Sequence, residues 1–256
     1  MRPYLFLSAL VALGAPAAVL AKDAALAEAV SAQHRSPNFV ARDQYRRPQD
    51  VLEFAGLKQN MTVVEAAPGG GYWTEILAPY LRDKGVYYNA VSARALPSLR
   101  KKLDGDEAVY GKVNVTDLSG EIAPAGSADL VVTFRNVHNW MAQGVADQTF
   151  KAFYDALKPG GTLLVEEHRA PADQPQDPKA VSGYVREDYT VGLAQKAGFK
   201  LVGKSEMLAN PKDTKDWPKG VWTLPPTLAL GDQDRAKYVA IGEADNFLLK
   251  FEKPAK

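Results

Sequence analysis

The residues whose types are best suited to binding or catalysis lie around a glycine-rich turn. Glu65 ends a short apolar stretch, and Pro68 and the three glycines Gly69, Gly70 and Gly71 follow it. Because glycine has no Cβ, the backbone of such a turn can approach a ligand closely. A neighbouring carboxylate accepts hydrogen bonds from a polar or cationic group. The pattern predicts a small-molecule site, although a strand-to-helix turn without a ligand has a similar sequence.

Two of the three histidines offer proton-transfer chemistry. His138 and His168 each follow a predicted strand, whereas His34 lies in the N-terminal region and receives no role. His138 suits a general base that accepts a proton from a substrate oxygen or nitrogen, with a structural loop histidine as the alternative. His168 is preceded by Glu166 and Glu167, and these residue types are suited to an oxygen and nitrogen metal site. Because the spacing matches no known metal motif, we predict no metal centre.

Alternating strands and helices are expected to position these residues. Strands that are apolar along their whole length are buried on both faces, which is typical of a parallel sheet covered by helices. We therefore predict an α/β protein with a doubly wound, mostly parallel Rossmann-like sheet. The expected strands are 62–65, 86–91, 109–113, 128–134, 162–166, 200–206 and 246–252, and the expected helices are 24–32, 48–54, 72–81, 96–103, 145–157, 187–197 and 232–243.

We expect one domain after a short leader. A long segment rich in proline and tryptophan precedes the last strand. Its Trp217 and Trp222 either wall the ligand site or pack on the outside of the core, and both interpretations stay open. The predicted parts are a leader at 1–21 and a domain at 22–256, divided into a helical lead-in (22–60), a core (61–206), an insertion (207–244) and a last strand (245–252).

The leader has the pattern of a cleavable secretion signal. Arg2 precedes an apolar run, and small residues lead to a predicted cut after Ala21. We expect a periplasmic or secreted protein with no stable membrane anchor after cleavage. The sequence does not indicate an oligomeric state.

Composition excludes several function classes. The 256 residues are 46% hydrophobic and 24% charged, which is ordinary for a folded globular protein. There is no cysteine, which excludes disulfides, zinc–thiolate sites and thiol nucleophiles. The chain has 31 basic and 30 acidic residues, and a net charge of +1 is too small to hold a nucleic-acid backbone.

The glycine turn resembles the first motif of class I S-adenosylmethionine (SAM)-dependent methyltransferases. The pattern Glu65-x-x-x-Gly69-x-Gly71 is similar to that motif, with Ala67 where the family has its first glycine. The sequence LKPGGTLL at 157–164 resembles the turn into the family's fifth strand, and AGF at 197–199 resembles the turn into its sixth. Together these motifs cover residues 50–206, and the resemblance implies the seven-stranded sheet of that family.

The resemblance also implies roles for particular residues. SAM would be the cofactor, with its methionine part at the glycine turn. An acid usually holds the ribose at the position matched by Ala90, which Asn89 precedes, and Asp117 is a polar alternative near the adenine. The implied catalytic residues are Arg135, Asn136 and His138. The implied cofactor-binding residues are Glu65, Pro68, Gly69, Gly70, Gly71, Tyr72, Thr74, Asn89, Asn114 and Val115.

A narrower resemblance points to a bacterial family of predicted methyltransferases, some with signal peptides. It rests on FRNxH at 134–138, EHRA at 167–170 and the segment from NPKD at 210–213 to Pro225-Pro226. We predict an exported SAM-dependent methyltransferase with a small-molecule or unknown methyl acceptor. Two alternatives stay open: a catalytically degenerate protein that binds another small molecule in the same crevice, and a metal-assisted hydrolase that uses His138, His168 and Glu166.

Overall fold

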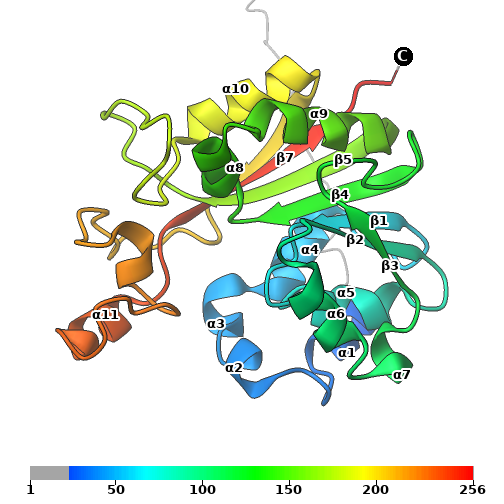
Figure 1. The fold of residues 1–256 in the computed structure, drawn as a ribbon, viewed down its shortest axis with the longest axis horizontal. Helices are drawn as coiled ribbons and strands as arrows, with labels where there is room; N and C mark the ends of the chain where they lie inside the picture. The colour runs from blue at the N-terminus through cyan, green and yellow to red at the C-terminus, as the bar shows by residue number, and fades with distance from the viewer. Residues whose placement is uncertain (1–22, 256) are drawn as a thin grey trace, which may run out of the picture.

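One seven-stranded sheet organises the protein in the computed structural model, which describes residues 23–255 (Figure 1). The predicted leader at 1–21 lies outside the described residues. The strand order is β3-β2-β1-β4-β5-β7-β6, and only β7 runs antiparallel to its neighbours. The strands are β1 (Thr62–Ala66), β2 (Val86–Val91), β3 (Val113–Asp117), β4 (Ala128–Phe134), β5 (Leu157–His168), β6 (Lys200–Ser205) and β7 (Asn246–Glu252).

Helices cover both faces of this sheet. In Figure 1, α8, α9 and α10 lie on one face, and α1, α4, α5 and α6 lie on the other. This confirms the doubly wound, mostly parallel arrangement expected from the apolar strands. The helices are α1 (Ala24–Val30), α2 (Pro37–Val40), α3 (Asp43–Arg46), α4 (Pro48–Ala55), α5 (Thr74–Leu81), α6 (Leu96–Leu103), α7 (Glu107–Tyr110), α8 (Val137–Gln143), α9 (Ala146–Ala156), α10 (Glu187–Ala197) and α11 (Arg235–Ile241), with a 3₁₀ helix at Gly220–Thr223.

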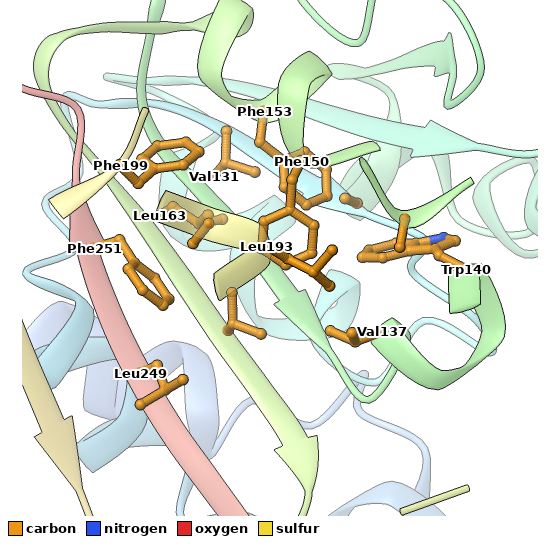
Figure 2. Packing of buried hydrophobic residues seen from close by; sticks show 14 of the residues in the cluster. Val131, Val137, Trp140, Phe150, Phe153, Leu163, Leu193, Phe199, Leu249 and Phe251 are labelled. Atoms are coloured by element: carbon orange, nitrogen blue, oxygen red, sulfur yellow. The ribbon is translucent and has the colours of Figure 1, made fainter. Parts of the chain in front are cut away.

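Two hydrophobic cores hold the layers together. Figure 2 shows the core under α8, α9 and α10, where Phe150 and Phe153 pack against Val131 and Leu163 of the sheet. These four side chains are fully buried. The opposite core joins α1, α4 and α5 to the other face of the sheet. The packing fixes the carboxyl ends of β1, β4 and β5 side by side, where parallel α/β sheets bind ligands.

The third strand is not where the sequence analysis placed it. Residues 109–113 were expected as a strand, but the Asp106 side chain accepts the Val109 N–H at 3.1 Å and starts the short helix α7. Tyr110 of that helix is buried, and the strand begins only at Val113. A helix cap therefore outweighs the strand propensity of the valines, and the strand ends at Asp117.

Helix α8 is a second difference from the expectation. Residues 135–138 were expected in a loop, but the chain enters α8 directly after the end of β4. Val137, Trp140 and Met141 are buried on one side of this helix. His138 consequently lies in its first turn, held by the same packing.

The segment 207–244 lies beyond the carboxyl edge of the sheet, on the side of α2 and α3 (Figure 1). It contributes most of a small third core, in which its Val221, Leu224 and Tyr238 pack with Tyr184 of the loop before α10. Among residues 23–255, no helix combines the length and apolar character needed to cross a membrane.

Candidate active site

Two cavities meet at the glycine turn. The first, of about 330 Å³, lies between the carboxyl edge of the sheet, the α2–α3 region and segment 221–227. The second, of about 600 Å³, lies between the ends of β2 and β3 and helices α8 and α9. Both cavities are lined by Ala67, Gly69, Asn136 and Asn139. An elongated ligand with a polar and a less polar half would therefore pass over the turn and occupy both.

The backbone of the turn explains its glycines. Ala67, Gly69 and Gly71 have φ angles of 57°, 58° and 85°. Residues other than glycine rarely adopt positive φ angles. A Cβ on Gly69 would meet no atom within 4 Å, so it would project into the space that the cavities share. A Cβ on Gly71 would instead collide with Lys102. Gly69 thus keeps space open for a ligand, and Gly71 permits packing.

Glu65 presents one carboxylate oxygen to the first cavity. Its Oε2 accepts hydrogen bonds from Thr74 Oγ1 at 2.8 Å, from the Tyr87 hydroxyl and from Asn89 Nδ2 at 3.2 Å. Burial is the main cause that raises the pKa of Glu65 to about 7, against the lowering effect of these donors. A cationic group beside Oε1 would stabilise the ionised form.

His138 and Glu167 form a hydrogen-bonded pair at the edge of the first cavity. The Glu167 carboxylate accepts the backbone N–H of His138 at 3.0 Å and that of His168 at 2.8 Å. Both of its oxygens lie 3.0 Å from His138 Nδ1. Because a carboxylate only accepts, Nδ1 carries the proton and Nε2 is left as a basic atom.

His168 is a second imidazole beside this pair. Its Nδ1 lies 2.8 Å from Asn246 Oδ1, and its ring centroid lies 5.6 Å from that of His138. Burial, and then the positive charge of Arg135, lower the pKa of His168 well below its usual value. The ring is therefore neutral at physiological pH.

Asn136 ties the two halves of the site together. Its Nδ2 lies 3.2 Å from the carbonyl oxygens of Ala67 and Phe134 and 3.3 Å from Thr133 Oγ1. These contacts anchor the glycine turn to the end of β4. Asn136 is consequently a positioning residue, although it also lines both cavities.

The structure brings together only part of the predicted site. The predicted residues that line a cavity are Glu65, Pro68, Gly69, Gly70, Tyr72, Arg135, Asn136 and His138. Gly71 and Thr74 support the turn from behind, and Asn89 is fully buried against Glu65.

Asn114 and Val115 line neither cavity. They lie within β3 because that strand starts later than predicted, and Asn114 Nδ2 donates to the Tyr87 carbonyl at 3.2 Å. Leu118 and Ser119, which follow the strand, line the second cavity instead. The alternative Asp117 accepts the Ser119 N–H at 2.9 Å and so shapes this turn.

Several lining residues were not anticipated from the sequence. Ser92 lies just after β2, two residues beyond Ala90, and lines the second cavity. The capped helix at Asp106 was the signal that would have placed β3 correctly and so identified Leu118 and Ser119. Arg42 and Arg46 of the lead-in also line the first cavity, and no local pattern marks them.

Of the two tryptophans in segment 207–244, one forms a wall of the ligand site and the other packs outside the main core. Trp222 lines the first cavity, and its ring centroid lies 5.9 Å from that of His138. Trp217 packs against Tyr238 and donates Nε1–H to Asp213 at 2.7 Å. One ring therefore walls the site, and the other stabilises the segment that carries it.

Comparison with known proteins identifies the family to which this chain belongs. The sequence profile described as a methyltransferase domain matches residues 40–203. The chain belongs to the methyltransferase domain family. A search of curated proteins by sequence found no significant match.

Solved structures of low sequence identity share the methyltransferase fold. A SAM-dependent methyltransferase from Aquifex aeolicus has a TM-score of 0.58 at 16% identity, covering 85% of this chain and 94% of that one. The cyclase SpnF has the same score and identity, covering 82% and 81%. A phosphoethanolamine N-methyltransferase of Haemonchus contortus, solved with SAM, has a TM-score of 0.54 at 16% identity, covering 91% of this chain and 60% of that one.

SAM is the cofactor that family membership assigns to this chain, and the residues present fit it. The open space beside Gly69 would be filled by any side chain there, and it joins a cavity with acidic and basic groups to one with apolar lining. Glu65 and the turn would hold the methionine part, and the second cavity would hold the nucleoside. In that cavity Ser92 would offer a hydroxyl to the ribose, whereas Ala90, at the position of the family's carboxylate, offers no polar group.

The side chains disfavour a metal centre. Ligand atoms of His138, Glu167 and His168 lie within 4.8 Å of one another, and all three residues are buried. However, the Glu167 carboxylate already accepts two backbone N–H groups and faces His138 Nδ1. Glu166, the acid of the hydrolase alternative, is fully buried and lies nearest to Arg135. The group is better suited to holding a proton than to holding a cation.

Proposed function

We propose that this protein transfers the methyl group of SAM to an oxygen or nitrogen atom of a small acceptor in the first cavity. The observation that carries the proposal is the position of the His138–Glu167 pair. His138 lines the same cavity as the glycine turn, and the Glu167 carboxylate behind it leaves Nε2 of His138 as the basic atom. SAM supplies an electrophilic methyl group on a sulfonium sulfur.

The residues of this chain have separate tasks in that reaction. Nε2 of His138 accepts the proton that the acceptor oxygen or nitrogen loses as it becomes methylated. Glu167 fixes the imidazole tautomer and stabilises the resulting positive charge. Asn136 holds the turn against β4, and Trp222 restricts access of water to the cavity. Most of the remaining catalysis comes from positioning.

Binding of SAM and of its demethylated product, S-adenosylhomocysteine, tests this proposal. The protein comprising residues 22–256 is titrated with each compound by calorimetry and by thermal unfolding. At ten times its dissociation constant a ligand adds about 1.4 kcal/mol of stability, which raises the melting temperature of a domain of this size by about 3–6 °C. No heat and no shift at millimolar concentrations of either compound would reject the proposal.

One observation favours a degenerate site as a second candidate. Ala90 is fully buried, and Asp155 is the one acid among the described residues that line the second cavity. Asp155 pairs with Lys151 at 2.7 Å, so no free carboxylate faces a ribose. A protein of this kind would bind neither compound, which the same titration detects.

Export is also part of the proposal and is supported by the sequence pattern of residues 1–21 alone. We expect the protein isolated from outside the cytoplasm to begin at Lys22. Intact mass measurement after expression with the leader tests this, and a mass that retains residues 1–21 in that fraction would contradict it.

A further inference from the structure

Three arginine side chains from two distant parts of the chain converge on one buried carboxylate. Arg42 Nε and Nη2 donate to Glu243 at 2.5 and 2.9 Å. Arg135 Nη1 donates to the same carboxylate at 2.6 Å. Arg46 Nε lies 3.5 Å from it. We call Arg42, Arg46 and Arg135 the arginine cluster, and all three line the first cavity.

The arginine cluster has more positive charge than its surroundings balance. Glu243 supplies one negative charge to three guanidinium groups. Glu166 lies 3.8 Å from Arg135 Nε and is the next nearest acid. Burial raises the pKa of Glu166 to about 7, so it supplies only part of a charge at neutral pH. At least one guanidinium therefore lacks a counter-ion.

Arg46 shows this imbalance most clearly. It is 5% exposed, and its Nε has no hydrogen-bond partner among residues 23–255. Its guanidinium lies 4.5 Å from the ring centroid of Tyr72, which partly offsets the cost of burial. A buried cationic donor without a partner is costly in a folded protein, so the cavity provides a place where an anion would be stabilised.

We propose that the arginine cluster binds a carboxylate or phosphate group of the methyl acceptor. This inference rests on the proposed function, since it assigns a substrate class to the same site. Planar guanidinium groups bind both anions through paired hydrogen bonds. Arg135 and His138 come from the same turn after β4. The acceptor is therefore a small anionic molecule whose nucleophilic oxygen or nitrogen lies near His138 while its anionic group lies against Arg135.

Glu243 occupies the centre of the arginine cluster as an internal anion. It belongs to segment 207–244, which also supplies Trp222 and the prolines that line the cavity. The acceptor's anionic group would share the cluster with Glu243, which lowers its affinity by repulsion. Removal of that repulsion should strengthen anion binding, an effect opposite to that of a purely structural ion pair.

The experiment measures binding of inorganic phosphate and of malonate to the protein saturated with S-adenosylhomocysteine, at an ionic strength fixed with chloride. Saturation matters because the cofactor has a carboxylate of its own. We expect both anions to bind to the saturated wild-type protein. Arg135→Gln should weaken binding at least tenfold, and Arg169→Gln should leave it unchanged. Arg169 is a matched control because it pairs with Glu187, Glu206 and Asp245 and lines neither of these two cavities.

Glu243→Gln is the second variant. A loss of binding in Arg135→Gln could result from misfolding, whereas a gain of binding in Glu243→Gln could not. This second variant should bind phosphate about tenfold more tightly than wild type, the scale of one additional charge-assisted hydrogen bond, and phosphate should restore any stability that it loses. Failure of phosphate and malonate to bind, or equal binding by wild type and Arg135→Gln, would overturn the inference.

Titration with S-adenosylhomocysteine separates failure of this inference from failure of the proposed function. If S-adenosylhomocysteine binds but displaces phosphate, the arginine cluster holds the cofactor's own carboxylate and the inference about the acceptor is wrong. If S-adenosylhomocysteine does not bind at all, the proposed function fails, and the inference fails with it.

Discussion

His138 and Glu167 face each other at 3.0 Å across the contact between α8 and β5, with the imidazole Nδ1 directed at the carboxylate. The same carboxylate accepts the backbone N–H groups of His138 and His168. Three donors thus fix one side chain, and this side chain fixes the orientation of the imidazole. The pair has the geometry of a base with its orienting group.

The tautomers of the histidines test this geometry directly. With only three histidines, nitrogen-15 spectra of the imidazoles are simple to assign. In the neutral rings we expect His138 and His168 to be protonated at Nδ1, and His34, whose Nε2 lies 2.7 Å from the Glu75 carbonyl, at Nε2.

Glu167→Gln should disturb this pattern at His138 and slow methyl transfer about 10²–10⁴-fold, while S-adenosylhomocysteine affinity changes little. His138 protonated at Nε2 in the wild-type protein would contradict the assigned base.

Cofactor affinity should depend on the ionisation of Glu65. Its pKa is raised to about 7, mainly by burial, and the ionised form attracts the ammonium group of the ligand. Affinity for S-adenosylhomocysteine should therefore rise as the pH increases from 6 to 8. Glu65→Gln should flatten this dependence and weaken binding about tenfold, the scale of a lost charge-assisted hydrogen bond.

Calorimetry at three pH values provides the measurement. Glu166→Gln is the matched control because Glu166 is also fully buried, has a pKa raised to about 7 and lines neither of the two cavities. An unchanged pH dependence in Glu65→Gln would exclude contact between this carboxylate and the ligand.

Glu166 should make the fold less stable as the pH rises. Burial raises its pKa from 4.5 to about 7, so between these values the folded state binds more protons than the unfolded state. Its stabilising contribution is complete below pH 4.5 and is lost as the pH rises through 7. A shift of this size corresponds to about 3 kcal/mol.

Urea unfolding at pH 4.5 and pH 8 measures this effect. Glu166→Gln should match the wild-type protein at the lower pH and be more stable by about 2–3 kcal/mol at the higher pH. Equal stability at pH 8 would show that Arg135 offsets the burial of the ionised Glu166.

The corrected end of β3 predicts which residue contacts the adenine. Leu118 and Val115 are both half-buried apolar residues near the end of this strand, but only Leu118 lines the second cavity. Leu118→Ala should weaken S-adenosylhomocysteine binding about 15- to 50-fold, the scale expected for loss of two or three buried carbons. Val115→Ala should change only stability. Weaker binding by Val115→Ala and unchanged binding by Leu118→Ala would instead support Val115, the residue expected from the sequence, as the adenine contact.

Apolar strands made much of the fold predictable. Five of the strands, including β2 and β4, have no competing local signal, so their bounds matched the expected ranges within one residue. The third strand was misplaced because Asp106 starts a helix in a stretch of high strand propensity. Helix α8 was missed because it follows β4 without a glycine or proline to mark its start, although buried Val137, Trp140 and Met141 recur at helical spacing.

The parts of the site that come from one short segment could be predicted from the sequence. The parts formed where distant segments meet could not. The glycine turn and residues 135–138 are local and were identified. The Arg42–Glu243 contact joins residues 201 positions apart, and no local pattern specifies it. Glu167, rather than Glu166, partners His138 because adjacent residues of a strand point to opposite faces, and the faces are assigned only by the folded sheet.

The proposed function is tested most directly by asking whether the cofactor occupies the space beside Gly69. Gly69 and Gly126 have φ angles of 58° and 64°, and a Cβ on either would meet no atom within 4 Å. Alanine therefore imposes the same backbone strain, about 1 kcal/mol, at both positions. Only Gly69 lines the two cavities.

Calorimetric titration of Gly69→Ala and Gly126→Ala with S-adenosylhomocysteine is the decisive measurement. We predict that both variants fold with similar losses of stability, that Gly126→Ala binds like the wild-type protein, and that Gly69→Ala loses at least tenfold in affinity. Equal affinities of the two variants would contradict a cofactor site at the glycine turn.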